Sequence, residues 1–132
     1  VVAGFGTGGT ISGIGWALKD AGSDAKTIAV EPAESALVTS GQAGPHKIQG
    51  IGANFVPKNL DRSVISEIRT VKGQDAIDTT KRLAREEGIF AGISAGANVF
   101  MALEVAKENP GKKIVAILPD GGDKYVSMGI FD

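Results

Sequence analysis

The sequence predicts an α/β protein of three layers, in which a mainly parallel β-sheet is covered by helices on both faces. Short apolar and β-branched runs alternate along the chain with longer stretches of helical periodicity, which is the pattern of βαβ units. Glycine-rich turns follow several of these runs, at the carboxyl ends of the expected strands, where such sheets bind ligands. We expect residues 1–132 to form a single α/β domain.

The first half of the chain predicts two strands and one helix. Residues 1–3 are an apolar run that ends in glycines, and residues 8–20 place Ile11, Ile14 and Leu18 at helical spacing. Residues 27–31 are β-branched and are stopped by Pro32. Residues 32–60 form the only long irregular segment, and a segment of that length in a compact domain is more often a lid or binding loop than an idle connection.

The second half predicts three strands and two helices. Residues 64–71 alternate as a strand does. Residues 73–87 have one apolar face and are followed by Gly88, where a helix places its terminating glycine. Residues 89–93 predict a strand, residues 95–108 a helix and residues 113–118 a final buried strand.

Composition excludes several classes of function. The 14 basic and 15 acidic residues give a net charge of −1, which argues against nucleic acid or a membrane surface as the partner. With no cysteine and one histidine, we expect neither a metal site nor a thiol nucleophile. No apolar run approaches the roughly 20 residues of a membrane span, and no leader is visible. We expect a cytoplasmic protein, and the strand-like start at Val1 suggests a piece of a longer one.

The first glycine-rich turn is the strongest candidate site. It follows a strand and opens a helix, a geometry in which backbone N–H groups hold a phosphate. No lysine follows it, so a Walker-type nucleotide site is improbable. A dinucleotide-binding reading stays open, because Gly4, Gly6 and Gly9 satisfy G-x-G-x-x-G and Glu31 ends the next strand. The residues of this turn are Gly6, Thr7, Gly8, Gly9 and Thr10.

Two later turns carry polar side chains. Ser94 lies in a G-x-S-x-G sequence, but a hydrolase triad needs a histidine after the serine, and His46 precedes it. Ser94 is therefore either a helix N-cap or a hydroxyl that faces a ligand. Asp120 and Asp123 belong to an Asp-Gly turn. A metal pair or an acid/base couple is the less favoured interpretation of these two carboxylates.

Together, four motifs resemble the C-terminal half of the cysteine synthase (O-acetylserine sulfhydrylase) family, among the fold-type-II pyridoxal-phosphate enzymes. They occur in the family's order and spacing over nearly the whole chain. The motifs are G-T-G-G-T at residues 6–10, H-K-I-Q-G-I-G at 46–52, G-I-F-A-G-I-S-A-G at 88–96, and I-L-P at 117–119 followed by Tyr125.

The resemblance implies a role for each motif. Residues 6–10 would bind the phosphate of pyridoxal 5'-phosphate, and Ser94 would donate a hydrogen bond to the pyridine nitrogen. A hydroxyl partner stabilises a neutral ring, which suits β-replacement. Pro119 and Asp120 would line the ring edge. Gly50, Ile51 and Gly52 would lie on the loop that closes over a small amino-acid substrate, in a reaction that makes L-cysteine from O-acetylserine and sulfide.

The chain also departs from the family pattern. Ala95 replaces the second serine of G-I-S-S-G, and Gly122-Asp123-Lys124-Tyr125 stands where Gly-Glu-Arg-Tyr is usual. No segment resembles the family's Schiff-base lysine or its loop for the substrate carboxylate. We therefore expect no catalytic residue in this chain, and no activity of the chain alone.

Related activities remain as alternatives. Cystathionine β-synthase shares the phosphate loop, serine and threonine dehydratases belong to the same class, and a nicotinamide-dependent oxidoreductase would rest on the dinucleotide reading. The resemblance further implies a homodimer. It also implies a cleft that receives the C-terminal tail of serine acetyltransferase, so that a fragment could serve as an interaction module alone.

Overall fold

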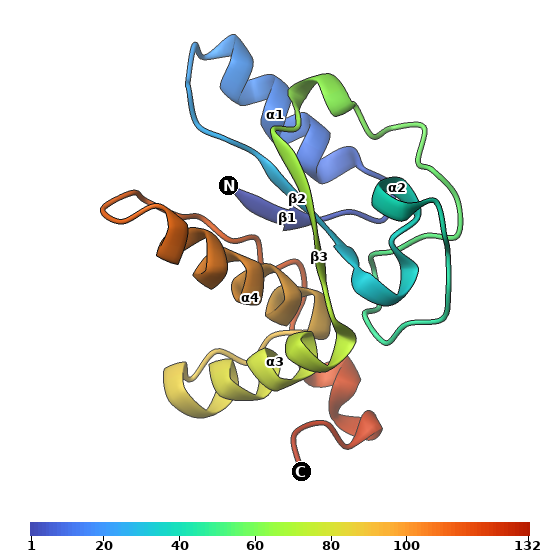
Figure 1. Cartoon of the computed structure of the whole chain (residues 1–132). Coiled ribbons are helices and arrows are strands. Elements are labelled where there is room, and N and C mark those ends of the chain that lie inside the picture. Colours follow the sequence, from blue (N-terminus) through green and yellow to red (C-terminus); the bar gives the residue numbers. More distant parts are fainter.

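Three parallel strands form the sheet of the computed structural model, which describes residues 1–132 (Figure 1). The strands are β1 (Val2–Gly4), β2 (Ile28–Pro32) and β3 (Glu67–Val71), and their order in the sheet is β1-β2-β3. Val2 pairs with Ile28, and Val30 pairs with Arg69. Parallel pairing requires a long crossover between consecutive strands, which α1 (Gly9–Asp20) provides between β1 and β2 and residues 33–66 provide between β2 and β3.

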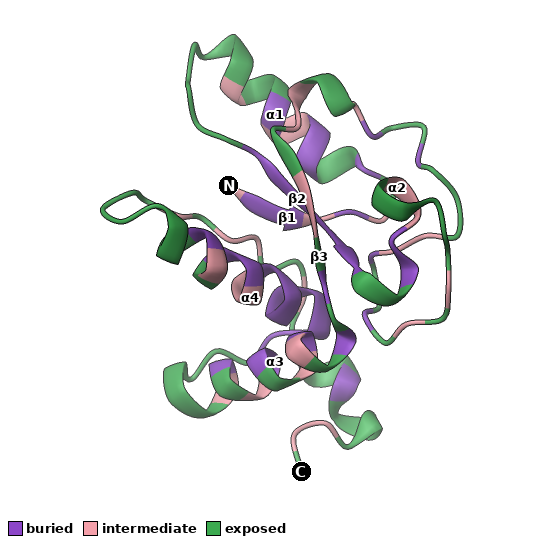
Figure 2. Cartoon of the chain, in the orientation of Figure 1, coloured by how far each residue is buried: buried purple, intermediate pink, exposed green.

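Helices cover both faces of this sheet, which confirms the three-layer prediction (Figure 1). Helix α1 (Gly9–Asp20) lies on one face, α4 (Ile93–Glu108) packs on the other, and α3 (Gly73–Glu87) packs against α4. Because strand side chains alternate between faces, Val2, Ile28 and Val30 join the core beneath α4, whereas Ala3 and Ala29 join Ile11 of α1. Figure 2 shows buried residues along β1 and β2 and on α4, whereas most of β3 is intermediate or exposed.

The prediction for residues 73–87 agrees with the structure at both ends. Helix α3 runs from Gly73 to Glu87, and Gly88 ends it in the left-handed conformation with φ of +68°. Glu34 accepts hydrogen bonds from the Gly73 N–H at the other end. The segment 32–60 contains a 3-10 turn at Ala33–Ser35 and the short helix α2 (Leu37–Ser40).

Two expected strands are wrong. Residues 89–93 make only an isolated antiparallel bridge, between Ala91 and Gly121, because Ile89 and Phe90 remain exposed and Ile93 already belongs to α4. Residues 113–118 run beside β1 and exchange hydrogen bonds with both polar groups of Val2, yet they form a single bridge and no regular strand. Val115 and Leu118 are exposed, so this segment is not the buried strand that its composition predicts.

The third strand is shorter than expected. Residues 62–64 form a 3-10 turn, and Asp61 caps it by accepting a hydrogen bond from the Ser63 N–H. The strand therefore begins at Glu67 rather than at residue 64. A third 3-10 segment, Asp123–Met128, follows the last glycine-rich turn.

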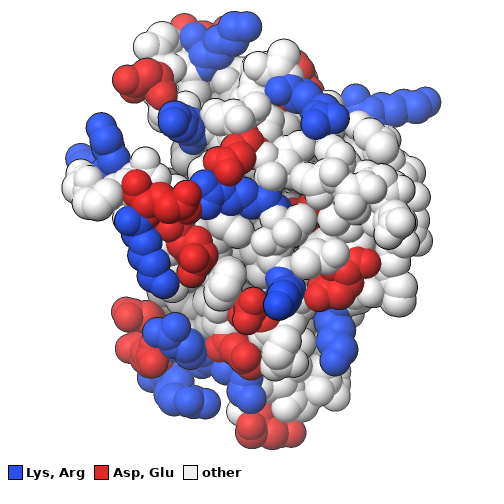
Figure 3. Space-filling view, viewed as in Figure 1, with Lys and Arg blue, Asp and Glu red and all other residues white.

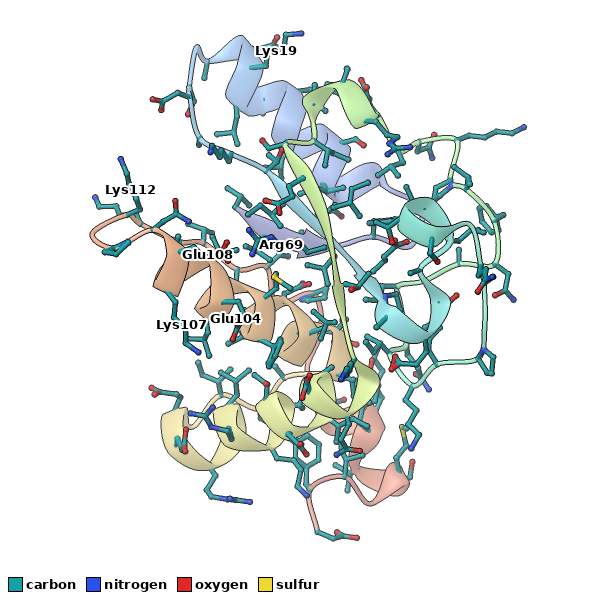
Figure 4. The ribbon with its side chains drawn as sticks, viewed as in Figure 1. Lys19, Arg69, Glu104, Lys107, Glu108 and Lys112 are labelled. Atoms are coloured by element: carbon teal, nitrogen blue, oxygen red, sulfur yellow. The ribbon has the colours of Figure 1, made fainter.

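An ion pair fastens the end of α4 to the sheet (Figure 4). Arg69 of β3 donates to Glu108 of α4 at 2.9 Å and to Glu67 at 2.6 Å. These carboxylates raise the pKa of Arg69, and the guanidinium lowers the pKa of Glu108. Figure 3 shows acidic and basic side chains intermingled on this face. No helix is both long and apolar enough to cross a membrane.

Candidate active site

A cavity of about 880 Å³ lies where β1 ends and α1 and α4 begin. Four segments that are far apart in sequence line it: the turn after β1, residues 49–55, the first turns of α4, and residues 117–125. All of the predicted site residues except Gly52 are part of this lining. The fold therefore brings together, around one cavity, the glycine turn, Gly50 and Ile51, Ser94 and the Pro119–Asp120 pair.

The glycine turn leaves the first N–H groups of α1 free for a ligand. Gly8 is the N-cap with φ of +88°, no side chain caps the helix, and its first turn holds no acidic residue. The Gly9 N–H has only a long contact of 3.4 Å to the Thr7 hydroxyl. Because the first N–H groups of a helix have no partner within it and carry its positive dipole end, this turn is suited to an anion such as phosphate.

Close backbone approach explains why glycine occupies two positions of the turn. A Cβ on Gly6 would lie 2.5 Å from the carbonyl oxygen of Gly50, and a Cβ on Gly8 would lie 2.7 Å from the Cα of Leu60. The turn is thus packed directly against Gly50 and against Leu60 at the end of segment 32–60.

His46 holds the loop of residues 46–52 in place. Its Nδ1 accepts a hydrogen bond from the Ile48 N–H at 3.1 Å, and its Nε2 lies 3.0 Å from the Gly52 carbonyl oxygen. Since Nδ1 acts as the acceptor, Nε2 carries the proton and donates. The Gly52 N–H in turn donates to the Phe5 carbonyl at 3.2 Å. Gly52 therefore lies behind the cavity lining and attaches the loop to the residue before the glycine turn.

Ser94 is the second residue of α4 and is 3% exposed. Gly92 is the N-cap, so the N-cap interpretation of Ser94 is wrong. A Cβ on Gly92 would overlap Asp120 Oδ1, which explains why the helix begins at a glycine. The hydroxyl of Ser94 belongs to the cavity lining instead.

The turn after Pro119 is held by side-chain contacts of Asp120. Tyr125 donates its hydroxyl proton to Asp120 Oδ2 at 2.7 Å, and the Lys124 ammonium lies 2.9 Å from the same oxygen. The Gly92 N–H donates to the Asp120 carbonyl at 3.1 Å. The turn is thereby fastened to the start of α4. Oδ2 of the Asp120 carboxylate contacts these two neighbours, and no contact joins Asp120 to Asp123.

The Tyr125 hydroxyl is expected to ionise at a higher pH than that of a free tyrosine. Burial and the hydrogen bond to Asp120 raise the pKa of Tyr125 to about 12, against about 10 for a free tyrosine. Its neutral form therefore stabilises the fold below pH 10, and this contribution is lost as the pH rises toward 12. The difference in tyrosinate absorbance between the wild type and Tyr125→Phe should show a midpoint near pH 12. A midpoint near pH 10 would contradict the observed hydrogen bond.

Sequence reasoning missed several residues of the lining, among them Asn98. Its position was available as a signal, because Asn98 follows Ser94 by one helical turn and shares its face. Gln49, Phe55 and Lys124 also line the cavity. Two buried oxygens in the lining, Asn98 Oδ1 and Asp120 Oδ1, have no hydrogen-bond donor within the chain.

Glu31, on which the dinucleotide reading depends, has a different role. It is 1% exposed and accepts hydrogen bonds from the N–H groups of Val38 and Thr39 and from the Thr39 hydroxyl. Its carboxylate is thus used to hold the start of α2 and does not line the cavity. A ribose-binding role for Glu31 is therefore incompatible with this fold.

Comparison with known proteins defines the class. The family model described as "Pyridoxal-phosphate dependent enzyme" matches residues 1–120. The chain belongs to this family, as the resemblance of its motifs indicated. Family membership also confirms pyridoxal 5'-phosphate as the cofactor of the class.

The similar relatives point to particular enzymes within this class. Cysteine synthase B of Campylobacter jejuni is 52% identical over 98% of the chain, and the O-ureido-L-serine synthase of Streptomyces lavendulae is 49% identical over 99%. The crystal structure of cysteine synthase from Entamoeba histolytica superposes with a TM-score of 0.95 at 40% identity, over 98% of the chain. The chain spans 43%, 41% and 39% of the lengths of these proteins, respectively.

Proposed function

We propose that the chain is the C-terminal, cofactor-binding part of a cysteine synthase, which makes L-cysteine from O-acetylserine and sulfide by β-replacement. The observation that carries this proposal is the single cavity that combines the anion cradle of residues 6–10 with the buried Ser94 hydroxyl. Relatives named cysteine synthase, 52% and 50% identical to the chain, support the choice among the activities of the family.

The residues of the cavity fit pyridoxal phosphate. Free N–H groups at the start of α1, in a turn where a Cβ on Gly6 or Gly8 would meet backbone, match a phosphate group. A neutral hydroxyl at Ser94, with no carboxylate bonded to it, matches an unprotonated pyridine nitrogen. The backbone cradle and the hydroxyl belong to one lining and would hold the two polar ends of the same molecule.

Each part of the lining then has a task in the reaction. Bound pyridoxal phosphate supplies an electron sink for the bond changes at the substrate's α- and β-carbons. Gly6, Thr7, Gly8, Gly9 and Thr10 bind the phosphate and fix the position of the ring. Ser94 donates its proton toward the ring nitrogen, Pro119 and Asp120 bound the ring edge, and the loop with Gly50, Ile51 and Gly52 excludes water from the bound amino acid.

The remaining parts of the proposal concern the whole protein. The lysine that binds the cofactor covalently and the groups that hold the substrate carboxylate lie outside this chain, so the chain alone is inactive. The complete enzyme is a cytoplasmic homodimer. Its cleft receives the C-terminal tail of serine acetyltransferase.

A phosphate titration tests the cradle. In nuclear magnetic resonance spectra, inorganic phosphate should shift the backbone amide signals of Gly8, Gly9 and Thr10 more than those of other residues, because these N–H groups are the donors. Sodium chloride at the same ionic strength serves as the control. Shifts that cluster elsewhere would remove the basis of the proposal.

The chain without the rest of the protein should form no specific covalent adduct with pyridoxal phosphate. Exposed lysines have a pKa near 10.4 and are protonated at neutral pH, which makes them poor nucleophiles. Borohydride reduction followed by peptide mapping should find scattered, substoichiometric labels. Stoichiometric labelling of one lysine would show that the chain carries its own attachment site.

Ser94→Ala in the full-length enzyme should lower cofactor affinity and rate modestly. The change removes one neutral hydrogen bond, worth about 1 kcal/mol, and the fold should persist because Gly92, not Ser94, caps α4. Ser94→Asp should slow β-replacement more, since a carboxylate favours a protonated ring. Steady-state kinetics and thermal stability of both variants provide the measurement. A fully active aspartate variant would exclude Ser94 from the site.

A further inference from the structure

The glycine turn of residues 6–10 needs a restraint from outside itself. Glycine has the widest backbone freedom of all residues, and no side chain caps α1 at Gly8. The backbone that restrains Gly8 is that of Leu60. A Cβ built on Gly8 would lie 2.7–2.8 Å from the Cα, Cβ and N atoms of Leu60. The conformation of the turn therefore depends on what holds Leu60 in place.

Two contacts hold this part of the chain. The side chain of Leu60 is buried and belongs to the small core that contains Phe5 and Ile11. The next N–H group along the chain, that of Asp61, donates a hydrogen bond to the Ser12 hydroxyl oxygen at 2.8 Å. Ser12 is fully buried, so its hydroxyl serves the interior of the protein and not the solvent. Leu60 is thus fixed by packing on one side and by Ser12 on the other.

Ser12 also belongs to the helix that the turn opens. Its N–H donates to the Gly8 carbonyl oxygen at 3.1 Å, so one residue bonds to the chain on both sides of the contact between Gly8 and Leu60. Trp16 lies one helical turn further along the same face of α1, and its indole N–H donates to Asp61 Oδ2 at 2.7 Å. Helix α1 therefore carries the chain segment that packs against its own N-terminal turn.

We propose that Ser12 is a positioning residue for the phosphate cradle. By accepting a hydrogen bond from the Asp61 N–H, it keeps Leu60 against Gly8 and holds the turn in its binding conformation before a ligand arrives. Such preorganisation raises affinity, because a protein that populates its binding conformation only part of the time binds more weakly in proportion to that fraction. This inference rests on the proposed function, because the ligand is then the phosphate group of pyridoxal phosphate.

Ser12→Ala and Thr27→Val form a matched pair. Each removes one buried hydroxyl that holds the chain around the 3-10 turn of residues 62–64, which lies beside α1 (Figure 1). The Thr27 hydroxyl donates to the Val64 carbonyl oxygen at 2.6 Å and accepts from the Ser66 N–H at 3.2 Å. Thr27 precedes β2 and therefore lies at the opposite edge of the parallel sheet from the glycine turn, which follows β1. Thr27→Val should lower stability at least as much as Ser12→Ala without moving the cradle, since it removes two bonds rather than one.

The test compares the wild type with both variants as full-length apoenzymes labelled with ¹⁵N-glycine. Inorganic phosphate should shift the Gly8 and Gly9 amide signals, and the half-saturating concentration should be about fivefold higher in S12A, the factor that one neutral hydrogen bond is worth. The affinity for pyridoxal phosphate, followed by absorbance, should fall by the same factor, and the ³¹P signal of the bound cofactor should move toward that of free cofactor. T27V should keep the wild-type values in all three measurements, although its melting temperature should fall at least as far.

Two outcomes overturn the inference. Equal losses of affinity in S12A and T27V would mean that overall stability, and not the position of Leu60, governs binding. Wild-type phosphate affinity in S12A would mean that core packing alone holds Leu60 against Gly8. If the wild type binds phosphate at these amides but binds no pyridoxal phosphate, the proposed function fails, whereas the phosphate titration still decides the role of Ser12 in the cradle.

Discussion

Gly8→Ala is expected to lower the affinity for pyridoxal phosphate about a hundredfold or more, which corresponds to about 2.7 kcal/mol. Gly8 has φ of +88°, and this left-handed conformation costs other residues about 1–2 kcal/mol. The new Cβ would also lie 2.7–2.8 Å from three atoms of Leu60, two of them backbone. The turn must move to relieve this contact, and the N–H groups that bind phosphate move with it.

Gly13→Ala provides the matched control in the same helix. No atom lies within 4 Å of a Cβ built on Gly13, and its φ is negative. Alanine should leave cofactor affinity unchanged and stabilise the helix by about 0.5–1 kcal/mol. Affinity can be measured by titrating the apoenzyme of each full-length variant with cofactor and following absorbance. Wild-type affinity in Gly8→Ala would disprove the cradle.

Elements whose signals are local could be predicted from the sequence. Helix α3 carries an apolar face along its whole length and a glycine at its end, and its bounds agree with the prediction. The glycine turn at residues 6–10 was recognisable because a strand before it and a helix after it are both encoded nearby. The parallel arrangement followed from the alternation of these elements.

Residues 113–118 show that local composition alone does not predict a regular strand. Their β-branched composition is that of a strand, but a regular strand also needs a paired neighbour, which is a property of the whole fold. Here Val2 is the only strand residue that exchanges backbone hydrogen bonds with the segment. Similarly, the start of α4 depends on Asp120, whose carboxylate occupies the space beside Gly92, and nothing within residues 89–93 encodes that contact.

The candidate site likewise contains residues that local sequence predicts and residues whose roles only tertiary contacts reveal. Glycine spacing marked the cradle, and the motif around Ser94 marked the start of α4. By contrast, the use of Glu31 to hold α2 arises from a contact seven and eight residues away, and the tether from Asn98 to Ile117 spans 19 residues. Such roles depend on which side chains the fold brings together, so residue type and local spacing do not reveal them.

The crossing of α3 and α4 should be the point most sensitive to added volume. A Cβ on Gly96 would overlap Thr80 Oγ1 and the Ala76 carbonyl oxygen. Thr80 is fully buried, and its hydroxyl donates to the Ala76 carbonyl at 2.8 Å. Because protein interiors are close-packed and deform little, the two helices cannot both keep their positions once a methyl group is inserted between them.

Gly96→Ala is therefore expected to destabilise the protein by about 3 kcal/mol, the upper end for an overpacked core. Gly13→Ala adds the same methyl group in open space and should not destabilise the protein. Denaturant unfolding of the full-length variants measures the difference. Thr80→Ala combined with Gly96→Ala should recover only part of the loss, since the Ala76 carbonyl still faces the new methyl group. Because Gly96 lies between Ser94 and Asn98, displacement of α4 should also weaken cofactor binding. An unchanged free energy of unfolding in Gly96→Ala would refute the close helix crossing.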